Sequence, residues 1–257
     1  MNRQFILAII LAASFSLNAD AQVATALNDT GIIACYKPNS PCDPVLHKKQ
    51  DAMVGRDAAA RTPGSGLTTN TGKGFSFTKI SRSGAAMADS AVLGDLPTDW
   101  ACSRDNVTGL VWEVKTNSPT NFRYKLHTYT WYNADPAKNG GSAGLQNGGS
   151  CSNAGRCDTE KYIQDIPAGL CGKSNWRLPI PKEVFNILDF GRQVGDTALV
   201  TGFFPNFAVS PSSAAYMHTS VISASDSGYI WYVHLVAGNI GLTVKGYLGG
   251  IMAVAGP

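Results

Sequence analysis

Six cysteines follow an N-terminal export signal in this 257-residue chain, and no other feature constrains its fold as strongly. Arg3 precedes the apolar stretch FILAIILAASFSL at 5–17, and Ala19-Asp20-Ala21 then supplies the small-residue pattern that signal peptidase reads. The stretch is too short for a membrane span, which needs about 20 apolar residues. We therefore expect residues 1–21 to be a signal peptide and the mature protein to be secreted or periplasmic, with no membrane span.

In an oxidising compartment an even number of cysteines indicates disulfides. Cys35 and Cys42 flank a Pro- and Asn-rich loop far from the others, so their simplest pairing is with each other. Three pairings are open to the other four, which are Cys102, Cys151, Cys157 and Cys171. A helix expected at 158–166 would be about 13 Å long, and the four residues after it span at most about 14 Å. A Cys157–Cys171 bridge would thus need a taut return, and we favour Cys151–Cys157 with Cys102–Cys171.

Composition narrows the class of protein further. Charged residues make up 15% of the chain, against roughly 25% in an average soluble domain. The 27 glycines favour turns and short strands over long surface helices. A net charge of +3 is too small for a nucleic-acid-binding surface. These values exclude coiled coils, polytopic membrane proteins and basic nucleic-acid binders.

The density of predicted structure rises at Asp99. Residues 22–98 contain one clear strand by alternation, at 74–80, and we expect them to form an N-terminal arm that packs on the main domain. Residues 99–257 should form that domain, with strands at 108–114, 176–178, 229–236, 240–244 and 251–254.

Two short helices are expected between these strands. Asp158 is a good N-cap for the first, at 158–166. Pro179 and Pro181 open the second and Gly191 stops it, with Val184, Ile187 and Leu188 on its inner face. A strand, two helices and then several antiparallel strands predict an α+β fold with a mainly antiparallel sheet.

Several segments resemble a single family: DNVTGLVWEVKT (105–116), CDTEKY (157–162), GLCGKSNWRLPIPKEVFNILDFGR (169–192), FFPN (203–206) and GYIWYVHLVAGNIG (228–241). The chain is similar to the Lcl C-terminal domain family, named for the C-terminal domain of a bacterial collagen-like adhesin and long catalogued as a domain of unknown function. The earlier segments LNDTG, CYKPNSPC, GRDA and GFSFTKI resemble the lead-in of many exported members. The resemblance covers nearly the whole mature chain.

This resemblance implies a C-type-lectin-like fold in an extracytoplasmic bacterial protein and, in the namesake adhesin, attachment to sulphated polysaccharide. The RLP-helix element is also similar to the formylglycine-generating enzyme group. Two departures matter. The chain ends Met252-Ala253-Val254-Ala255-Gly256 where family members commonly carry an Arg-bearing strand, which weakens the carry-over of anionic glycan binding. It also lacks a collagen-like Gly-x-y tract.

No sequence pattern predicts catalysis, a cofactor or a metal site. HExxH, GxSxG and a complete Walker loop are absent. The histidines sit at no recognised ligand spacing and are expected at the surface: His47, His127, His218 and His234. A four-thiolate zinc site typically contains a CxxC pair, and a calcium-dependent lectin site contains an EPN- or WND-like triplet. Neither pattern is present in the sequence. Since disulfides explain all the cysteines better than reactive thiols do, we expect a protein that is not an enzyme.

The most recognisable family positions are Trp112, Trp176, Arg177 and Glu183. We interpret them as architectural. Tryptophans on strands usually fill a core, and Arg177 with Glu183 could bridge the strand to the start of the second helix.

Alternation in the last strands suggests a binding face. With Trp231 and Val233 inward, Tyr232 and His234 point outward. The outer side of the neighbouring strand would then carry Thr243 and Lys245. Aromatic rings beside a cation suit a glycan, whereas the simpler interpretation is a solvated outer sheet face.

The sequence therefore favours an exported, non-catalytic binding or adhesion-type domain that recognises a polysaccharide or another surface protein. The alternative is a structural or assembly component of the cell envelope with only protein partners.

Overall fold

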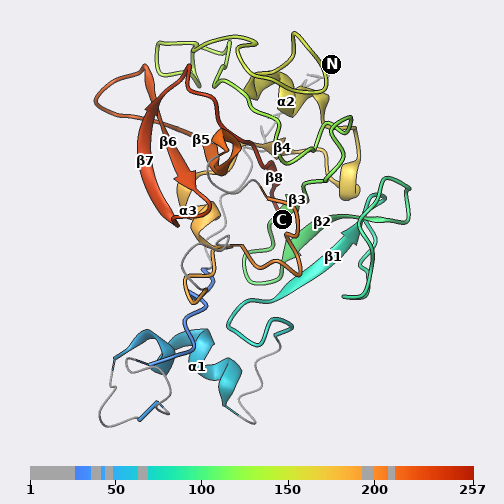
Figure 1. Cartoon of the computed structure of the whole chain (residues 1–257), viewed down its shortest axis with the longest axis vertical. Helices are drawn as coiled ribbons and strands as arrows, with labels where there is room; N and C mark the ends of the chain where they lie inside the picture. The colour runs from blue at the N-terminus through green and yellow to red at the C-terminus, as the bar shows by residue number, and fades with distance from the viewer. Residues whose placement is uncertain (1–26, 36–41, 44–48, 63–68, 193–198, 208–211) are drawn as a thin grey trace, which may run out of the picture.

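The last strand of the chain lies between two others, β3 and β4, in the larger of two sheets. This sheet has the order β1-β2-β3-β8-β4, the smaller has the order β5-β6-β7, and neighbouring strands in both are antiparallel. Figure 1 shows the smaller sheet on one side of the molecule and β1 and β2 of the larger sheet on the other, with β8 and β4 between them. The computed structural model describes residues 27–35, 42, 43, 49–62, 69–192, 199–207 and 212–257, so the expected signal peptide lies outside the described residues.

The strands run Phe77–Ser81 (β1), Trp100–Asp105 (β2), Val111–Glu113 (β3), Trp176–Arg177 (β4), Tyr216–Ile222 (β5), Tyr229–His234 (β6), Asn239–Val244 (β7) and Val254–Ala255 (β8). The α-helices are Gly55–Arg61 (α1), Thr159–Asp165 (α2) and Pro181–Phe185 (α3), with 3₁₀ turns at Asp51–Met53, Leu170–Gly172 and Ser213–Ala215. The α+β class expected from the sequence is confirmed. In the described part of the chain, each helix is too short to cross a bilayer.

The TG of the TGLVWE segment makes the turn between β2 and β3. Gly109 has a φ of +76°, which favours glycine, and its amide donates to the Asp105 carbonyl at 2.8 Å. The Thr108 hydroxyl donates to the Asp105 carboxylate at 2.7 Å. Because the turn takes up these residues, β3 begins at Val111 and is shorter than the expected strand at 108–114.

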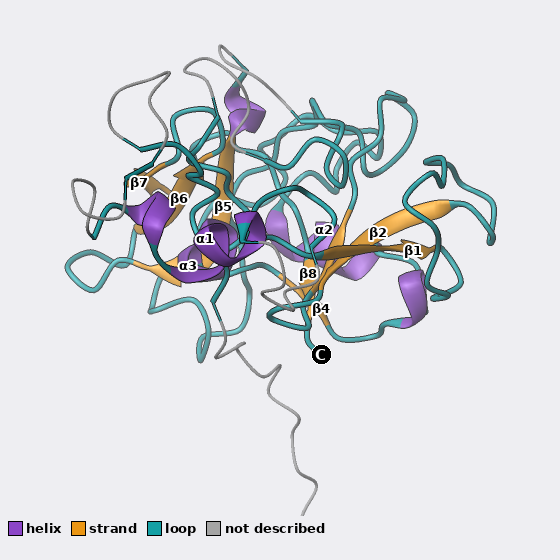
Figure 2. Ribbon diagram, turned by 90° about the horizontal axis from the view of Figure 1, so that it is seen from below, coloured by secondary structure: helices purple, strands orange, loops and turns teal. Residues whose placement is uncertain are grey.

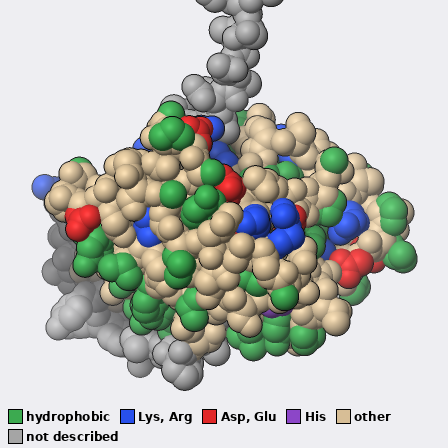
Figure 3. Space-filling view, turned by 90° about the horizontal axis from the view of Figure 1, so that it is seen from above, with side chains coloured by type: hydrophobic (Ala, Val, Ile, Leu, Met, Phe, Trp, Pro, Cys, Tyr) green, Lys and Arg blue, Asp and Glu red, His purple; other side chains and the backbone are tan. Residues whose placement is uncertain are grey.

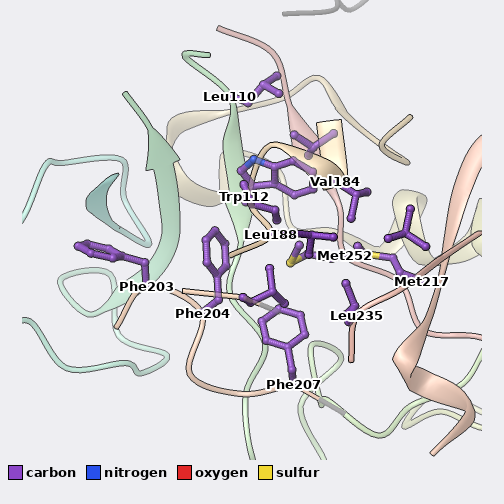
Figure 4. Packing of buried hydrophobic residues seen from close by; sticks show 14 of the residues in the cluster. Leu110, Trp112, Val184, Leu188, Phe203, Phe204, Phe207, Met217, Leu235 and Met252 are labelled. Carbon is purple, nitrogen blue, oxygen red and sulfur yellow. The ribbon is translucent and has the colours of Figure 1, made fainter. Parts of the chain in front are cut away.

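The larger sheet is buried on both faces. Trp112 and Val254 point to one side, into a cluster shared with the smaller sheet, while Val111 and Ala255 point to the other. Figure 4 shows the first cluster, in which phenylalanines of the 203–207 loop pack beside Trp112 and Met252. Phe77 of β1 joins this cluster, so the strand that was expected in the arm is an edge strand of the larger sheet.

Helix α3 ends earlier than predicted. The prediction of a helix up to Gly191 is wrong because the chain tightens after Phe185 into three-residue turns, with the Leu188 amide donating to the Phe185 carbonyl at 3.2 Å. Leu188 then forms an antiparallel bridge with Leu199. The expected inner face, consisting of Val184, Ile187 and Leu188, is nevertheless fully buried. Figure 2 shows α3 beside the smaller sheet.

Three disulfides hold this fold. They join Cys35 to Cys42, Cys102 to Cys171, and Cys151 to Cys157, and these are the pairs that the sequence spacing favoured. Cys102–Cys171 connects β2 to the turn just before β4, whereas Cys151–Cys157 closes a short loop before α2. All the cysteines are thus used in crosslinks.

A buried carboxylate joins three distant segments below α2. Glu113 at the end of β3 is fully buried and accepts hydrogen bonds from Lys115 Nζ at 2.7 Å and from the Tyr162 hydroxyl at 2.5 Å. Its Oε1 also accepts from the Ala253 amide at 3.0 Å, next to β8. The charge of Glu113 is therefore matched by Lys115, and α2 is held to the larger sheet by its own Tyr162.

The two disulfides of the main domain should differ in their contribution to stability. In the chain-entropy account, the longer closed loop restricts the unfolded chain more, and the two loops have sequence separations of 69 and 6. We expect Cys102→Ala/Cys171→Ala to lower the free energy of unfolding by about 4 kcal/mol and Cys151→Ala/Cys157→Ala by about 2 kcal/mol. Urea denaturation measures the free energy of unfolding of both variants. Equal losses would contradict the expectation that Cys102–Cys171 contributes more to stability than Cys151–Cys157 does.

Candidate functional site

The outer face of the smaller sheet brings together two of the predicted binding residues. Tyr232 and His234 both contact Tyr216 of β5, with ring centroids 5.2 and 4.5 Å apart, and Tyr247 joins them at 5.5 Å. The rings meet at steep angles of 59–88°, so they pack against one another. The face is therefore a compact aromatic cluster and not a row of open ring faces.

Lys245 does not lie on this face, and that prediction is wrong. The chain leaves β7 after Val244, and Lys245 is buried beneath the 139–142 turn. Its Nζ donates to the carbonyl of Asn139 at 2.8 Å and lies 4.2 Å from the centroid of the Trp131 ring. Backbone carbonyls and an aromatic ring thus satisfy this cation inside the protein.

The expected inward set is also only partly correct. Val233 is fully buried, but Trp231 is half-buried. Ile230, on the same side as Tyr232, is fully buried, because this side of the sheet also packs against protein at one end. Thr243 pairs with Ile230 and is half-buried.

Two of the histidines expected at the surface are buried. His218 is fully buried, its Nε2 lies 3.0 Å from the Tyr129 carbonyl, and burial lowers its pKa to about 4. His127 is also buried, and desolvation lowers its pKa. His47 lies outside the described residues. A neutral His218 is therefore a hydrogen-bonded core residue.

A cleft of about 680 Å³ lies where the two sheets and α2 meet. Its lining elements, α2, β4 and β5, lie next to one another in Figure 1. Its apolar side chains are Trp131, Tyr132, Ile163, Trp176 and Leu178, and its polar side chains are Asn133, Lys138, Thr159, Glu160, Gln164, Arg177 and Ser220. The volume falls within the usual range of ligand sites, about 300–1,000 Å³.

One wall of the cleft is fixed by a two-way hydrogen bond. The Thr159 hydroxyl, in the first turn of α2, donates to the Tyr132 carbonyl at 2.8 Å and accepts from the Tyr132 amide at 2.9 Å. The carboxylate of Glu160 accepts from the Ala134 amide at 3.0 Å. Asp158 caps the helix by accepting from the Lys161 amide. Backbone atoms thus hold the 132–134 segment, and the Tyr132 side chain takes no part in the clamp.

Another part of the wall is fixed by an ion pair between the half-buried Arg177 and the buried Glu183. Arg177 donates from both terminal nitrogens to the Glu183 carboxylate, at 2.6 and 2.8 Å. Glu183 also accepts from the Ile180 amide at 2.9 Å, at the start of α3. This bidentate pair bridges β4 to α3 and fixes the side chain of Arg177 beside the cleft.

The family positions therefore divide between core and cleft. Trp112 is fully buried in the core, and Glu183 lies beneath the cleft wall. Trp176 and Arg177 line the cleft, and each has a buried donor, Nε1 and Nε respectively, without a partner among the described residues. An unpaired buried donor costs about 1–3 kcal/mol. The sequence singled out these residues but gave no sign that they share a cleft with residues of the 131–138 segment.

A second group of polar side chains lies in the N-terminal arm. Asp29, Asp51 and Asp57 bring carboxylate oxygens within 4.8 Å of one another, the arrangement a cation would require. Burial and the neighbouring Asp29 raise the pKa of Asp57, although its carboxylate accepts from the Gly31 and Gly74 amides. These hydrogen bonds from backbone amides connect segments of the arm to one another. The sequence predicted no metal site at these residues.

A family model described as the Lcl C-terminal domain matches residues 101–254, which run from the second residue of β2 to the first residue of β8 and include every residue of the cleft. No curated protein and no solved structure matches the chain.

Removal of one partner of the Arg177–Glu183 pair should cost more than removal of both charges. Arg177→Met leaves the buried Glu183 carboxylate unpaired, so we expect a loss of about 3 kcal/mol in the free energy of unfolding. Glu183→Gln keeps the oxygen that accepts from the Ile180 amide, and the double variant should recover part of that loss. A double-mutant cycle in urea measures the coupling, and additive effects would contradict a structural role for the pair.

Proposed function

The chain belongs to the Lcl C-terminal domain family, and on that premise we propose that it is an exported, non-catalytic domain that recognises a polysaccharide through the cleft between Tyr132 and Arg177. The observation that carries the proposal is the cleft itself, in which aromatic and aliphatic walls stand beside amide, hydroxyl and charged groups. Sugar rings combine apolar C–H faces with many hydroxyls, and this mixture of walls complements both.

The donors in the cleft wall support a ligand rich in oxygen atoms. The Gln164 and Asn133 amides offer donors and acceptors at the cleft, whereas Trp176 Nε1 and Arg177 Nε are buried within its wall. A polyhydroxylated ligand offers acceptor oxygens to these amide donors.

The rigidity of the walls supports binding without a large ordering cost. Thr159 clamps the backbone of Tyr132, Glu183 fixes Arg177, and Glu113 holds α2 to the larger sheet. A site whose walls are already ordered loses less conformational entropy on binding. The cleft therefore suits recognition of a fixed shape.

We propose further that the domain is C-type-lectin-like and secreted or periplasmic. The two antiparallel sheets, the few short helices and the α2–larger-sheet packing support the first part. Three disulfides support the second, because disulfides persist in oxidising compartments. The same crosslinks leave no thiol for chemistry of the formylglycine-generating kind, which supports a non-catalytic role.

One observation favours the alternative, a cell-envelope component with only protein partners. On edge strand β7, Ile240, Leu242 and Val244 are 41%, 42% and 45% exposed, next to the exposed Tyr229 of β6. Neighbouring exposed apolar side chains on a sheet edge are typical of protein contacts. This surface is on the opposite side of the smaller sheet from the aromatic cluster.

A glycan array with the mature 22–257 protein tests the proposal, using a matched pair of tyrosine variants. Tyr132→Ala removes a ring from the cleft and leaves its backbone clamp intact, so we expect binding to fall at least about tenfold. Tyr232→Ala removes a ring of the outer aromatic cluster and should leave binding unchanged. EDTA should have no effect.

Absence of any glycan signal would overturn the proposal in favour of protein partners. Loss of binding in Tyr232→Ala but not in Tyr132→Ala would move the site to the outer sheet face. Loss of binding with EDTA would show that a cation is required.

A further inference from the structure

The cations that line the cleft are already paired. Both terminal nitrogens of Arg177 bind Glu183, so the guanidinium charge is balanced inside the wall. Lys138 pairs with Asp135 at 3.4 Å, on the exposed side of the cleft. Both cations therefore have a carboxylate beside them, which weakens their attraction for a sulfate group, more for the bidentate Arg177 pair than for the exposed Lys138 pair.

One carboxylate of the cleft lacks such a partner. Glu160 lines the cleft, and the ion pairs formed within the described part of the chain do not include it. Its Oε1 accepts from the uncharged Ala134 amide, which fixes the side chain without cancelling its charge. The cleft and its paired residues therefore carry one uncompensated negative charge.

The aromatic residues act in the same direction. Trp131, Tyr132 and Trp176 all line the cleft, and aromatic faces carry a negative quadrupole that attracts cations and disfavours anions. The final strand adds no positive charge, since residues 252–255 are Met-Ala-Val-Ala. On the face drawn in Figure 3, charges of both signs are scattered among neutral side chains.

We infer that the cleft takes an uncharged polysaccharide and rejects sulfated ones, and that Glu160 sets this selectivity by repulsion. The inference rests on the proposed function and specifies its ligand class. Specificity often depends on a group that penalises the wrong ligand as well as on groups that bind the right one. Here Glu160 supplies the penalty, while Tyr132, Trp176 and the amides supply the contacts.

Matched polymers that differ only in sulfation test the inference directly. We would measure binding of the mature protein to dextran and dextran sulfate, and to neutral agarose oligosaccharides and sulfated carrageenan oligosaccharides, at two NaCl concentrations. We expect at least one neutral polymer to bind at least about tenfold more tightly than its sulfated partner. Affinity for the neutral polymer should change little with salt, because no ion pair with the ligand is formed.

Glu160→Gln isolates the charge, because glutamine keeps an oxygen to accept from the Ala134 amide. We expect this variant to bind the sulfated polymer severalfold more tightly than the wild type does, with unchanged affinity for the neutral one. Asp89→Asn is the matched control: it removes an exposed carboxylate of the arm that lines no part of the cleft and keeps an acceptor for Asn70. This control should change neither affinity.

Tighter binding of the sulfated members, weakened by salt, would overturn the inference and leave the proposed polysaccharide function intact. An unchanged preference in Glu160→Gln would overturn the assignment to this residue. If none of these polymers bound, while the glycan array showed binding to a charged glycan, the inference would be wrong and the proposed polysaccharide function would stand. Absence of binding in both the polymer experiment and the glycan array would overturn the proposed function as well.

Discussion

The buried carboxylate of Glu113 is the constraint on which the rest of the structure depends. It receives hydrogen bonds from Lys115, from Tyr162 of α2 and from the Ala253 amide, so β3, α2 and the last strand meet at one charge. Removal of a partner would leave an ion in the interior, which proteins rarely tolerate. Because Tyr162 is on α2, the same interaction fixes the helix whose first turn carries Thr159 and Glu160. The geometry of the cleft thus follows from a contact in the core.

Some of the residues most recognisable in the family both stabilise the fold and line the cleft. Arg177 completes a bidentate pair with Glu183 and also lines the cleft, and Trp176 packs in the core beside β8 while its side chain borders the same space. An interpretation of these positions as purely architectural is therefore incomplete. It also follows that a variant of Arg177 would change stability and binding together, which is why binding is better tested with Tyr132 and Glu160.

The sequence could predict what depends on local spacing and burial. Cys151 and Cys157 pair across a short loop, Asp158 caps α2, and Val184 and Leu188 are inward even though α3 is shorter than its pattern suggested. It could not predict contacts made between distant segments. Alternation placed Lys245 on the outer face, but the strand ends one residue earlier and the 139–142 turn covers the side chain. The cleft escaped prediction for the same reason, since its walls come from 131–138, α2, β4 and β5.

Hydrogen exchange of the mature protein, with and without a glycan found to bind it, tests most directly whether the cleft is the binding site. We predict slower exchange of backbone amides at 131–138, 159–164 and 176–178 in the presence of the glycan, because a ligand there shields the walls and suppresses their local opening. The strands of the smaller sheet, apart from the cleft residue Ser220, should exchange at unchanged rates. Protection confined to 229–247, with the cleft segments unaffected, would contradict the account.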